Sequence, residues 1–338
     1  MSNNSEKKTK TITETASALN NFLDRKMAFL IPTGVVLGLV FPAIFIKIRP
    51  LVPLLFGILT FTGAMKLKAR DLLLAVKNPV PVILFLITAH CIMPLAVLFI
   101  SSAIFRNDPN TVSGFVLLYS VPTAVVSFIW AAIYKGDAAL TLAIILLDTL
   151  LAPFVVPGTV KILLGTKIML NMTGMTLSLI YMIVIPTIIG VTMNEISKGV
   201  VPKKAGPFLG PLSKICLAFV ISANCAAIAP QVNFKSTRLW IIAGTCIALT
   251  VLGFSLGKIF GYLGGRLGLL GKNKKEKTAS IFFATGLKNI SAAMTLVIEF
   301  FPQAASLPTV LGVVFQQSIC AIMGRLYLGK IPGEKADF

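Results

Sequence analysis

The sequence predicts an all-α polytopic membrane protein with ten transmembrane helices, and three observations support this prediction. Of the 338 residues, 56% are hydrophobic and only 13% are charged, whereas a soluble domain carries about a quarter charged residues. The mean hydropathy is +0.89. The charges are clustered, and the uncharged runs between them reach the roughly 20 residues that a helix needs to cross a bilayer. Because a bilayer offers no water to backbone groups, each run must be helical.

The spans follow one another along the chain, divided by short polar loops and flanked by tails at residues 1–26 and 331–338. The expected spans are residues 27–46, 50–65, 79–104, 110–133, 138–160, 174–194, 207–229, 237–262, 278–298 and 304–324. Most of them contain, or lie within, a stretch free of Asp, Glu, Lys and Arg. These stretches are residues 27–46, 78–105, 109–134, 168–194, 215–234, 239–257 and 300–324.

The net charge of +19 indicates a topology rather than a nucleic-acid surface. The two tails and the even-numbered loops hold 21 Lys and Arg residues, and the odd-numbered loops hold 7. Since Lys and Arg gather in cytoplasmic loops, we expect a multi-pass plasma-membrane protein with both tails in the cytoplasm. The lipid bilayer is the expected partner, and the sequence implies neither nucleic acid nor a protein partner.

An internal repeat is indicated by two proline patterns at nearly the same offset. Ile31-Pro32-Thr33 recurs as Ile185-Pro186-Thr187, 154 residues later, and a proline pair at 50 and 53 recurs at 207 and 211. Halves of five spans each, residues 27–165 and 166–330, must have opposite orientations in the membrane. This is the inverted-repeat architecture of secondary transporters. Chance placement of prolines is the alternative.

The fourth expected span has a proline near its middle. Pro122 removes one backbone hydrogen bond and kinks or breaks a helix. Thr123 and Ser127 beside it can satisfy the freed groups or face a ligand. A simple packing kink is the alternative.

The ninth expected span holds Gly286, Lys288 and Asn289 at a similar depth. A charge and an amide in mid-membrane are costly unless they serve a site. Together with Pro122, this cluster predicts two broken helices that cross at the midplane, where inverted-repeat transporters bind their substrates.

Lys288 and Asp148 are the base and the acid expected at mid-bilayer. A lysine there costs roughly 3 kcal/mol on insertion scales, and it lies too deep to reach the membrane surface easily. Pairing with Asp148 would offset most of this cost. The pair is then either a static salt bridge or one that opens when substrate or a proton arrives.

Three more polar residues lie within expected spans. His90 is either a packed neutral group or a proton carrier. Asn224 is expected to form interhelical hydrogen bonds, and Gln316 is expected either to do the same or to line the cavity. The chain has no paired-carboxylate motif, no His-rich metal motif and no serine–histidine arrangement. It is therefore expected to be no enzyme and to hold neither a metal nor another cofactor.

Several short motifs, in order and at the matching spans, resemble bacterial members of the bile acid:sodium symporter family. They are Met93-Pro94, Lys135-Gly136-Asp137, Gly286 with Asn289, residues 301–305 (Phe-Pro-Gln-Ala-Ala) and Leu307-Pro308. The resemblance implies two inverted five-helix repeats. It also implies a panel of spans 1, 2, 6 and 7, a core of spans 3–5 and 8–10, and crossed broken spans 4 and 9. Family substrates are organic anions, from bile acids to small carboxylates, usually driven by sodium.

The sodium ligands implied by the resemblance are largely missing. An acidic residue two positions before the span-nine glycine is Ala284 here, and a glutamine two positions after it is Lys288. The Ser-Asn pair after the span-four break reads Ser127-Phe128. Because a hard cation needs oxygen ligands, we expect no sodium site of the usual kind.

In span five, a family threonine is replaced by Ile145, while Thr141 fits a family hydroxyl position and Asn289 matches a position next to substrate.

These features predict a secondary active or facilitative transporter of a small or amphipathic organic anion that works by alternating access. Lys288 would stand in for a sodium ion. Transport is uncoupled if Lys288 keeps its proton and proton-coupled if it loses it. The alternatives are a sodium-coupled symporter with altered sites and a membrane sensor or scaffold of the same fold. The expected substrate and coupling residues are Lys288, Asn289, Asp148, Ser127, Thr123, Thr141 and Gly286.

Overall fold

The structure is a computed structural model that describes residues 14–16, 18–20, 22–23, 27–77, 79–165 and 170–329. Within these residues the regular elements are helical, and the one isolated β-bridge joins Thr123 to Lys288. The expected tail at 331–338 lies outside the described residues. The tail at 1–26 is described only at its three short helical pieces between residues 14 and 23.

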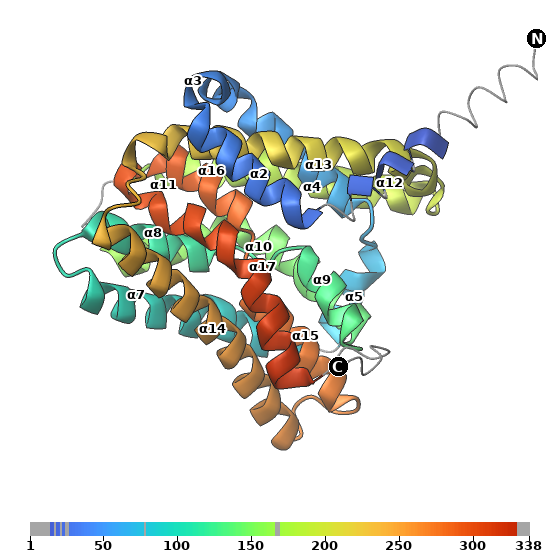
Figure 1. Ribbon diagram of the computed structural model, residues 1–338. Helices are drawn as coiled ribbons and strands as arrows, with labels where there is room; N and C mark the ends of the chain where they lie inside the picture. The colour runs from blue at the N-terminus through green and yellow to red at the C-terminus, as the bar shows by residue number, and fades with distance from the viewer. Residues whose placement is uncertain are drawn as a thin grey trace, which may run out of the picture. The chain divides into compact units, whose positions relative to one another are not determined.

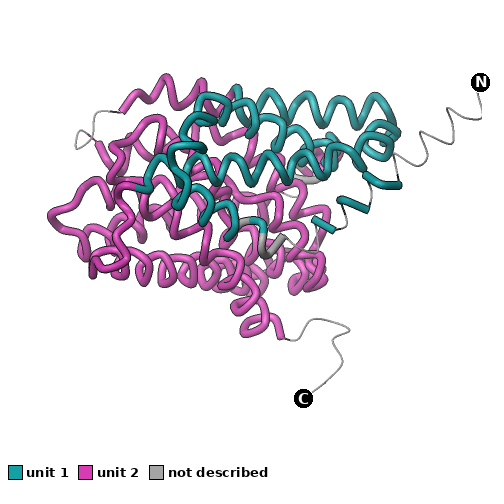
Figure 2. The backbone as a smooth tube through the Cα atoms, turned by 45° about the horizontal axis from the view of Figure 1, so that its top comes forward, with its two compact units in different colours: residues 1–69, 181–229 teal, residues 70–180, 230–338 magenta. Residues whose placement is uncertain are grey.

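The chain divides into two compact units (Figure 2). Unit 1 comprises Met1–Ala69 and Tyr181–Ala229, and unit 2 comprises Arg70–Ile180 and Pro230–Phe338. Each unit therefore combines a segment from the first half of the chain with one from the second half.

Unit 1 is built around the long helix α13, against which α2 packs closely. A Cβ atom at Gly38 would lie 2.3 Å from the Ser222 carbonyl oxygen, so the close approach of the two backbones requires glycine there. The Ser222 hydroxyl donates to the Gly34 carbonyl at 2.9 Å. The helices of this unit are α2 (Met27–Val40), α3 (Pro42–Phe45), η1 (Ile46–Leu51), α4 (Val52–Ala64), α12 (Ile185–Ile196) and α13 (Val200–Ile228).

The first expected span differs from the structure. Helix α2 ends at Val40, because Pro42 has no N–H and disfavours a helical conformation at Phe41. The expected loop around residues 47–49 was wrong, since these residues belong to the 3₁₀ segment η1 within one helical stretch, Pro42–Ala64.

Unit 2 holds the remaining helices, and Figure 1 shows α15 and α17 beside α14. They are α6 (Pro79–Leu86), η2 (Ile87–Ile92), α7 (Met93–Ile104), α8 (Pro109–Ser120), α9 (Val126–Ile133), α10 (Ala138–Leu164), α11 (Met172–Leu179), α14 (Thr237–Arg266), α15 (Lys274–Gly286), α16 (Ile290–Phe300), η6 (Gln303–Ala305) and α17 (Leu307–Leu328). Three further elements lie at or next to the unit boundaries: α5 (Ala69–Lys77), η4 (Ile180–Val184) and η5 (Ala229–Gln231).

The core of unit 2 near the end of α15 is aromatic. The rings of Phe282 and Phe283 meet edge to face with centroids 4.9 Å apart, and Phe254 of α14 packs against both. A Cβ atom at Gly286 would lie 2.2 Å from the Phe254 ring. Gly286 therefore allows the end of α15 to pack directly on this ring.

Seven described helical stretches are long and apolar enough to span a membrane. They are Pro42–Ala64, Pro79–Ile104, Ala138–Leu164, Met172–Ile196, Val200–Gln231, Thr237–Arg266 and Gln303–Leu328. The protein is thus an all-helical polytopic membrane protein. The expected fourth and ninth spans are interrupted helices, α8 with α9 and α15 with α16, so ten spans remain a prediction.

Candidate functional site

Both predicted helix interruptions are present in unit 2. Helix α8 ends at Ser120 and α9 begins at Val126, while α15 ends at Gly286 and α16 begins at Ile290. Val121 is extended, with φ −65° and ψ 156°, because a residue that precedes proline avoids the helical region. Pro122 thus breaks its helix rather than merely kinking it.

The two interruptions satisfy each other's backbone groups. They pair in antiparallel fashion at Thr123 and Lys288. The Ala124 N–H donates to the Leu287 carbonyl at 3.0 Å, and the Asn289 N–H donates to the Pro122 carbonyl at 2.8 Å. Since unpaired backbone groups are costly inside a membrane, this short pairing allows both helices to be broken there.

Gln316 of α17 holds the backbone of Lys288. Its amide oxygen accepts from the Lys288 N–H and its amide nitrogen donates to the Lys288 carbonyl, each at 3.0 Å. Gln316 was expected either to join helices by hydrogen bonds or to line the cavity. The structure shows the first, a contact from α17 to the break between α15 and α16.

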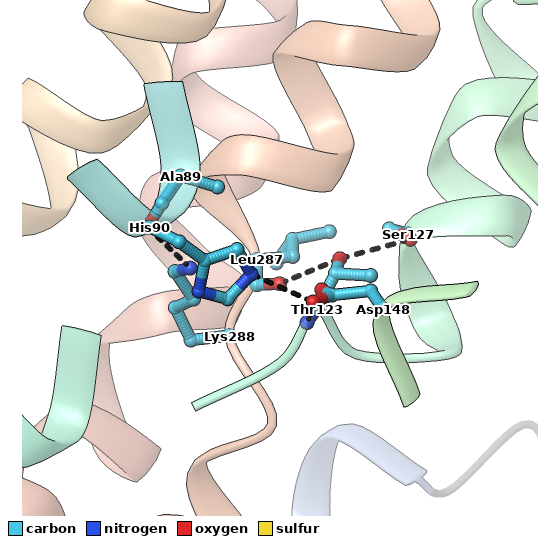
Figure 3. A network of polar contacts seen from close by, with 7 residues as sticks. All are labelled: Ala89, His90, Thr123, Ser127, Asp148, Leu287 and Lys288. Atoms are coloured by element: carbon cyan, nitrogen blue, oxygen red, sulfur yellow. Dashed lines mark hydrogen bonds and ion pairs between the residues drawn. The ribbon is translucent and has the colours of Figure 1, made fainter. Parts of the chain in front are cut away.

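The ammonium group of Lys288 is buried, with 1% of the residue exposed, and donates to the Ala89 carbonyl at 3.2 Å (Figure 3). Among the described residues, no carboxylate lies within ion-pairing distance of it. Lys288 and Asp148 therefore do not form the expected direct ion pair, although the two charges lie close enough to interact electrostatically. Both oxygens of Asp148 are occupied by other donors.

Asp148 of α10 binds His90 and the first interruption. Its Oδ1 lies 2.6 Å from His90 Nε2, and its Oδ2 accepts from the Thr123 N–H at 2.7 Å. All three residues are buried. In a neutral imidazole, donation from Nε2–H to this carboxylate would leave the lone pair on Nδ1. Nδ1 is buried and has no hydrogen-bond partner in the structure.

The turn that carries His90 explains why the Ala89 carbonyl is open to Lys288. Segment η2 is a π-helical turn, in which the Met93 N–H bonds the Thr88 carbonyl rather than that of Ala89. The next donor in this register would be residue 94, which is proline and has no N–H. The Ala89 carbonyl therefore lacks the backbone donor that either register would supply. Turns of this type are frequent at functional sites.

The remaining expected site residues have mainly structural contacts. Ser127 accepts weakly from the Thr123 hydroxyl at 3.5 Å, and Thr123 also donates to the Leu287 carbonyl at 3.0 Å. Asn289 caps α16 by accepting from the Ala292 N–H at 3.3 Å. Thr141 donates to the Asp137 carbonyl within its own helix.

Asn224 is buried on α13, in unit 1. The sequence analysis did not predict that the Ala89 carbonyl binds Lys288. A proline four residues after His90 was the available signal for an altered helical turn there. Within the described part of the chain, no group of three or more His, Cys, Asp or Glu residues could hold a metal ion.

Comparison with known proteins identifies the family. Residues 52–233 match the Sodium Bile acid symporter family. Uncharacterized protein YbaS of Bacillus subtilis (strain 168) is 36% identical over 300 residues, which cover 89% of this chain and 96% of that protein. The uncharacterized sodium-dependent transporter YocS of the same organism is 22% identical over 94% of this chain and 95% of its own length.

A plant relative is matched over a smaller share of its own length. The probable sodium/metabolite cotransporter BASS3 (chloroplastic) of Oryza sativa subsp. japonica is 25% identical over 80% of this chain and 61% of its own length.

The fold and the site define a polytopic helical membrane protein with a buried polar network at two interrupted helices. The chain belongs to the sodium bile acid symporter family, and it is a membrane transporter of that family. The family members it matches are transporters rather than enzymes.

Proposed function

We propose that this transporter carries a small or amphipathic organic anion without sodium, and that the Lys288 ammonium supplies the positive charge at the substrate site. The observation that carries the proposal is the state of this ammonium. It is fully buried, has no carboxylate partner among the described residues, and binds one backbone carbonyl.

An ammonium group has three donors, and the structure uses one of them. Burying a charge costs several kcal/mol unless it is paired and hydrogen-bonded. An incoming carboxylate or sulfate would supply the missing acceptors and a negative charge in direct contact with the ammonium. Helices α9 and α16 begin at the interruptions, and their N-termini add partial positive charge for an anion.

The same residue argues against a sodium ion. The resemblance places a sodium ligand at Lys288 and an acidic ligand at Ala284, and neither residue offers a side-chain oxygen. The printed names of two relatives include sodium. For this chain we propose that the ammonium replaces the cation.

The proposed transport architecture has ten spans in two inverted repeats, residues 27–165 and 166–330, with both tails in the cytoplasm. The short helix α2 and the two interrupted helices would join the seven long helices as spans. Unit 1 contains the expected spans 1, 2 and 7 and most of span 6, and unit 2 contains the rest. This division resembles the expected panel and core and supports alternating access.

The test measures anion binding to the purified full chain in detergent. The readout is the Tm of thermal unfolding, and pyruvate and taurocholate are the probes. We expect at least one of these anions to raise the Tm equally in NaCl and KCl. That anion should also be taken up into proteoliposomes without sodium. A strict sodium requirement, or no binding of either anion, would overturn the proposal. Binding without counterflow in vesicles would favour a sensor over a carrier.

A matched pair of lysine variants tests the role of the ammonium. Lys288→Gln should abolish the Tm shift caused by the anion. Lys258→Gln should preserve it, because Lys258 of α14 also donates to a backbone carbonyl, that of Tyr327, but lies outside the network. If Lys288→Gln leaves anion binding intact, Lys288 has only a structural role.

A further inference from the structure

We infer that His90 and Asp148 form the proton-coupling site of this carrier, with a proton taken up on His90 Nδ1 whenever an anion binds at Lys288. The inference rests on the proposed function and deepens it. It assigns the coupling ion, the atom that accepts it and a stoichiometry of one proton per negative charge.

The proposed proton acceptor, His90 Nδ1, is free to take up a proton. His90 Nε2 is committed to Asp148 at 2.6 Å, while Nδ1 is buried without a partner. A proton can add to the Nδ1 lone pair without breaking any bond of the network. The Nε2–H would stay on the carboxylate, and the ring would become an imidazolium paired with Asp148.

Charge balance makes the two binding events depend on each other. With His90 neutral, the Asp148 carboxylate and the Lys288 ammonium cancel. A bound monovalent anion alone would leave a net negative charge, and a bound proton alone would leave a net positive one. An uncompensated charge is strongly disfavoured in a buried site. The empty state and the state with both ligands are therefore the favoured ones.

Two contacts link the proton site physically to the anion site. Asp148 Oδ2 holds the Thr123 N–H, and Thr123 pairs with Lys288 across the interruptions. The Lys288 ammonium in turn holds the Ala89 carbonyl, next to His90 in the same π-helical turn. An anion that draws the ammonium away from Ala89 would thus release the turn that positions the imidazole.

Other ionisable groups near His90 are few. Among the described residues, α6 and α7 contain none, and α10 contributes Asp148 to this contact. Helix α8 contributes Tyr119, whose hydroxyl donates to the Cys246 carbonyl. Helix α14 contributes Cys246, whose thiol donates to the Pro308 carbonyl. The charged side chains of α10 and α14 that lie toward the helix ends are Lys161, Arg238, Lys258 and Arg266. Cys91, in the same turn as His90, is exposed.

The first experiment counts protons on the wild-type chain. The anion that raises the Tm, pyruvate or taurocholate, is added to protein in weakly buffered detergent solution while the pH is recorded. We expect about one proton to be taken up per bound anion. Binding of the anion with no proton uptake would overturn the inference while leaving the proposed function intact.

The second experiment uses proteoliposomes with equal potassium on both sides and valinomycin. A proton gradient of one pH unit, alkaline inside, should drive about tenfold accumulation of the anion, because the two ligands move together. His90→Gln, whose amide can still donate to Asp148, should lose this accumulation and bind the anion more weakly than the wild type, because no proton compensates the charge of the anion. Cys91→Ser, in the same turn, should keep both the accumulation and the wild-type anion affinity.

Persistence of proton-driven accumulation in His90→Gln would show that another group carries the proton. If His90→Gln fails to fold, the wild-type proton count decides the question. A requirement for sodium would instead refute the proposed function.

Discussion

The side-chain amide of Gln316 bonds both the N–H and the carbonyl of Lys288, so one side chain takes the place of a neighbouring strand. The first interruption pairs with the same stretch at Thr123. Lys288 is thus fixed at its backbone by two elements, whereas its ammonium group makes a single bond.

Replacement of Gln316 should therefore destabilise the protein. Gln316→Leu leaves the buried Lys288 N–H without a partner, whereas the Lys288 carbonyl keeps the Ile290 N–H. Because one unsatisfied buried group costs about 1–3 kcal/mol, we expect a loss of roughly that size, measured by unfolding in detergent. Gln317→Leu is the control, because Gln317 accepts from the partly buried Trp130 indole at 3.1 Å and, among the described residues, from no backbone N–H. Equal losses in the two variants would argue against the backbone role of Gln316.

Gly286 is expected to tolerate no side chain. Gly286→Ala places a Cβ atom 2.2 Å from the Phe254 ring, and such overpacking costs typically 1–3 kcal/mol. Gly244→Ala on α14 meets no atom within 4 Å and should be neutral or slightly stabilising. Phe254→Leu combined with Gly286→Ala should recover part of the loss, and absence of any recovery would point to a different cause.

Replacement of Pro94 by alanine is expected to strengthen anion binding. Pro94→Ala supplies the N–H that the Ala89 carbonyl lacks, which would loosen the hold of that carbonyl on the Lys288 ammonium. A hydrogen bond has a net value of about 1 kcal/mol, so anion affinity should rise about fivefold in a titration. Pro157→Ala within α10 is the control. Unchanged or weaker binding in Pro94→Ala would contradict this role of the carbonyl.

Asp108 is expected to give the stability a dependence on acidic pH. Burial alone would raise its pKa, but hydrogen bonds from Thr111 and the Arg238 guanidinium outweigh burial and hold the pKa below its usual value. The stabilisation is present above the ordinary pKa of 3.8. It is lost as the pH falls through the lower pKa of the folded state.

Asp108→Asn keeps a good N-cap for α8 but removes this charge. We expect a flatter fall in Tm between about pH 5 and pH 3. Asp137→Asn is the control, since Asp137 caps α10 by accepting from the Leu140 N–H, with no arginine bonded to it among the described residues. A wild-type acid profile in Asp108→Asn would contradict the prediction.

Much of the fold was predictable from the sequence because charge and proline act locally. The uncharged run from residue 78 to 105 marks the helical stretch Pro79–Ile104, and Pro122 marks the first interruption. The end of the first span was misplaced because its limit was taken from Lys47, whereas Pro42 sets it.

The candidate site was predictable in its residues but not in its partners. Depth along a span follows from counting, so Lys288 and Asp148 were expected at one level. The direction in which a side chain points depends on the local turn. The π-helical turn at Ile87–Ile92 brings His90 to Asp148 and presents Ala89 to Lys288. Neither contact follows from spacing alone, because each joins residues more than fifty positions apart.

The presence of one carboxylate and one ammonium in the same buried network has an electrical consequence. A membrane voltage does work of about 2.3 kcal/mol per elementary charge per 100 mV. With His90 neutral, Asp148 and Lys288 sum to zero, and a proton bound together with a monovalent anion leaves that sum unchanged. The resting voltage of the cell would then neither drive nor hinder displacement of this network within the bilayer, whether it is empty or loaded.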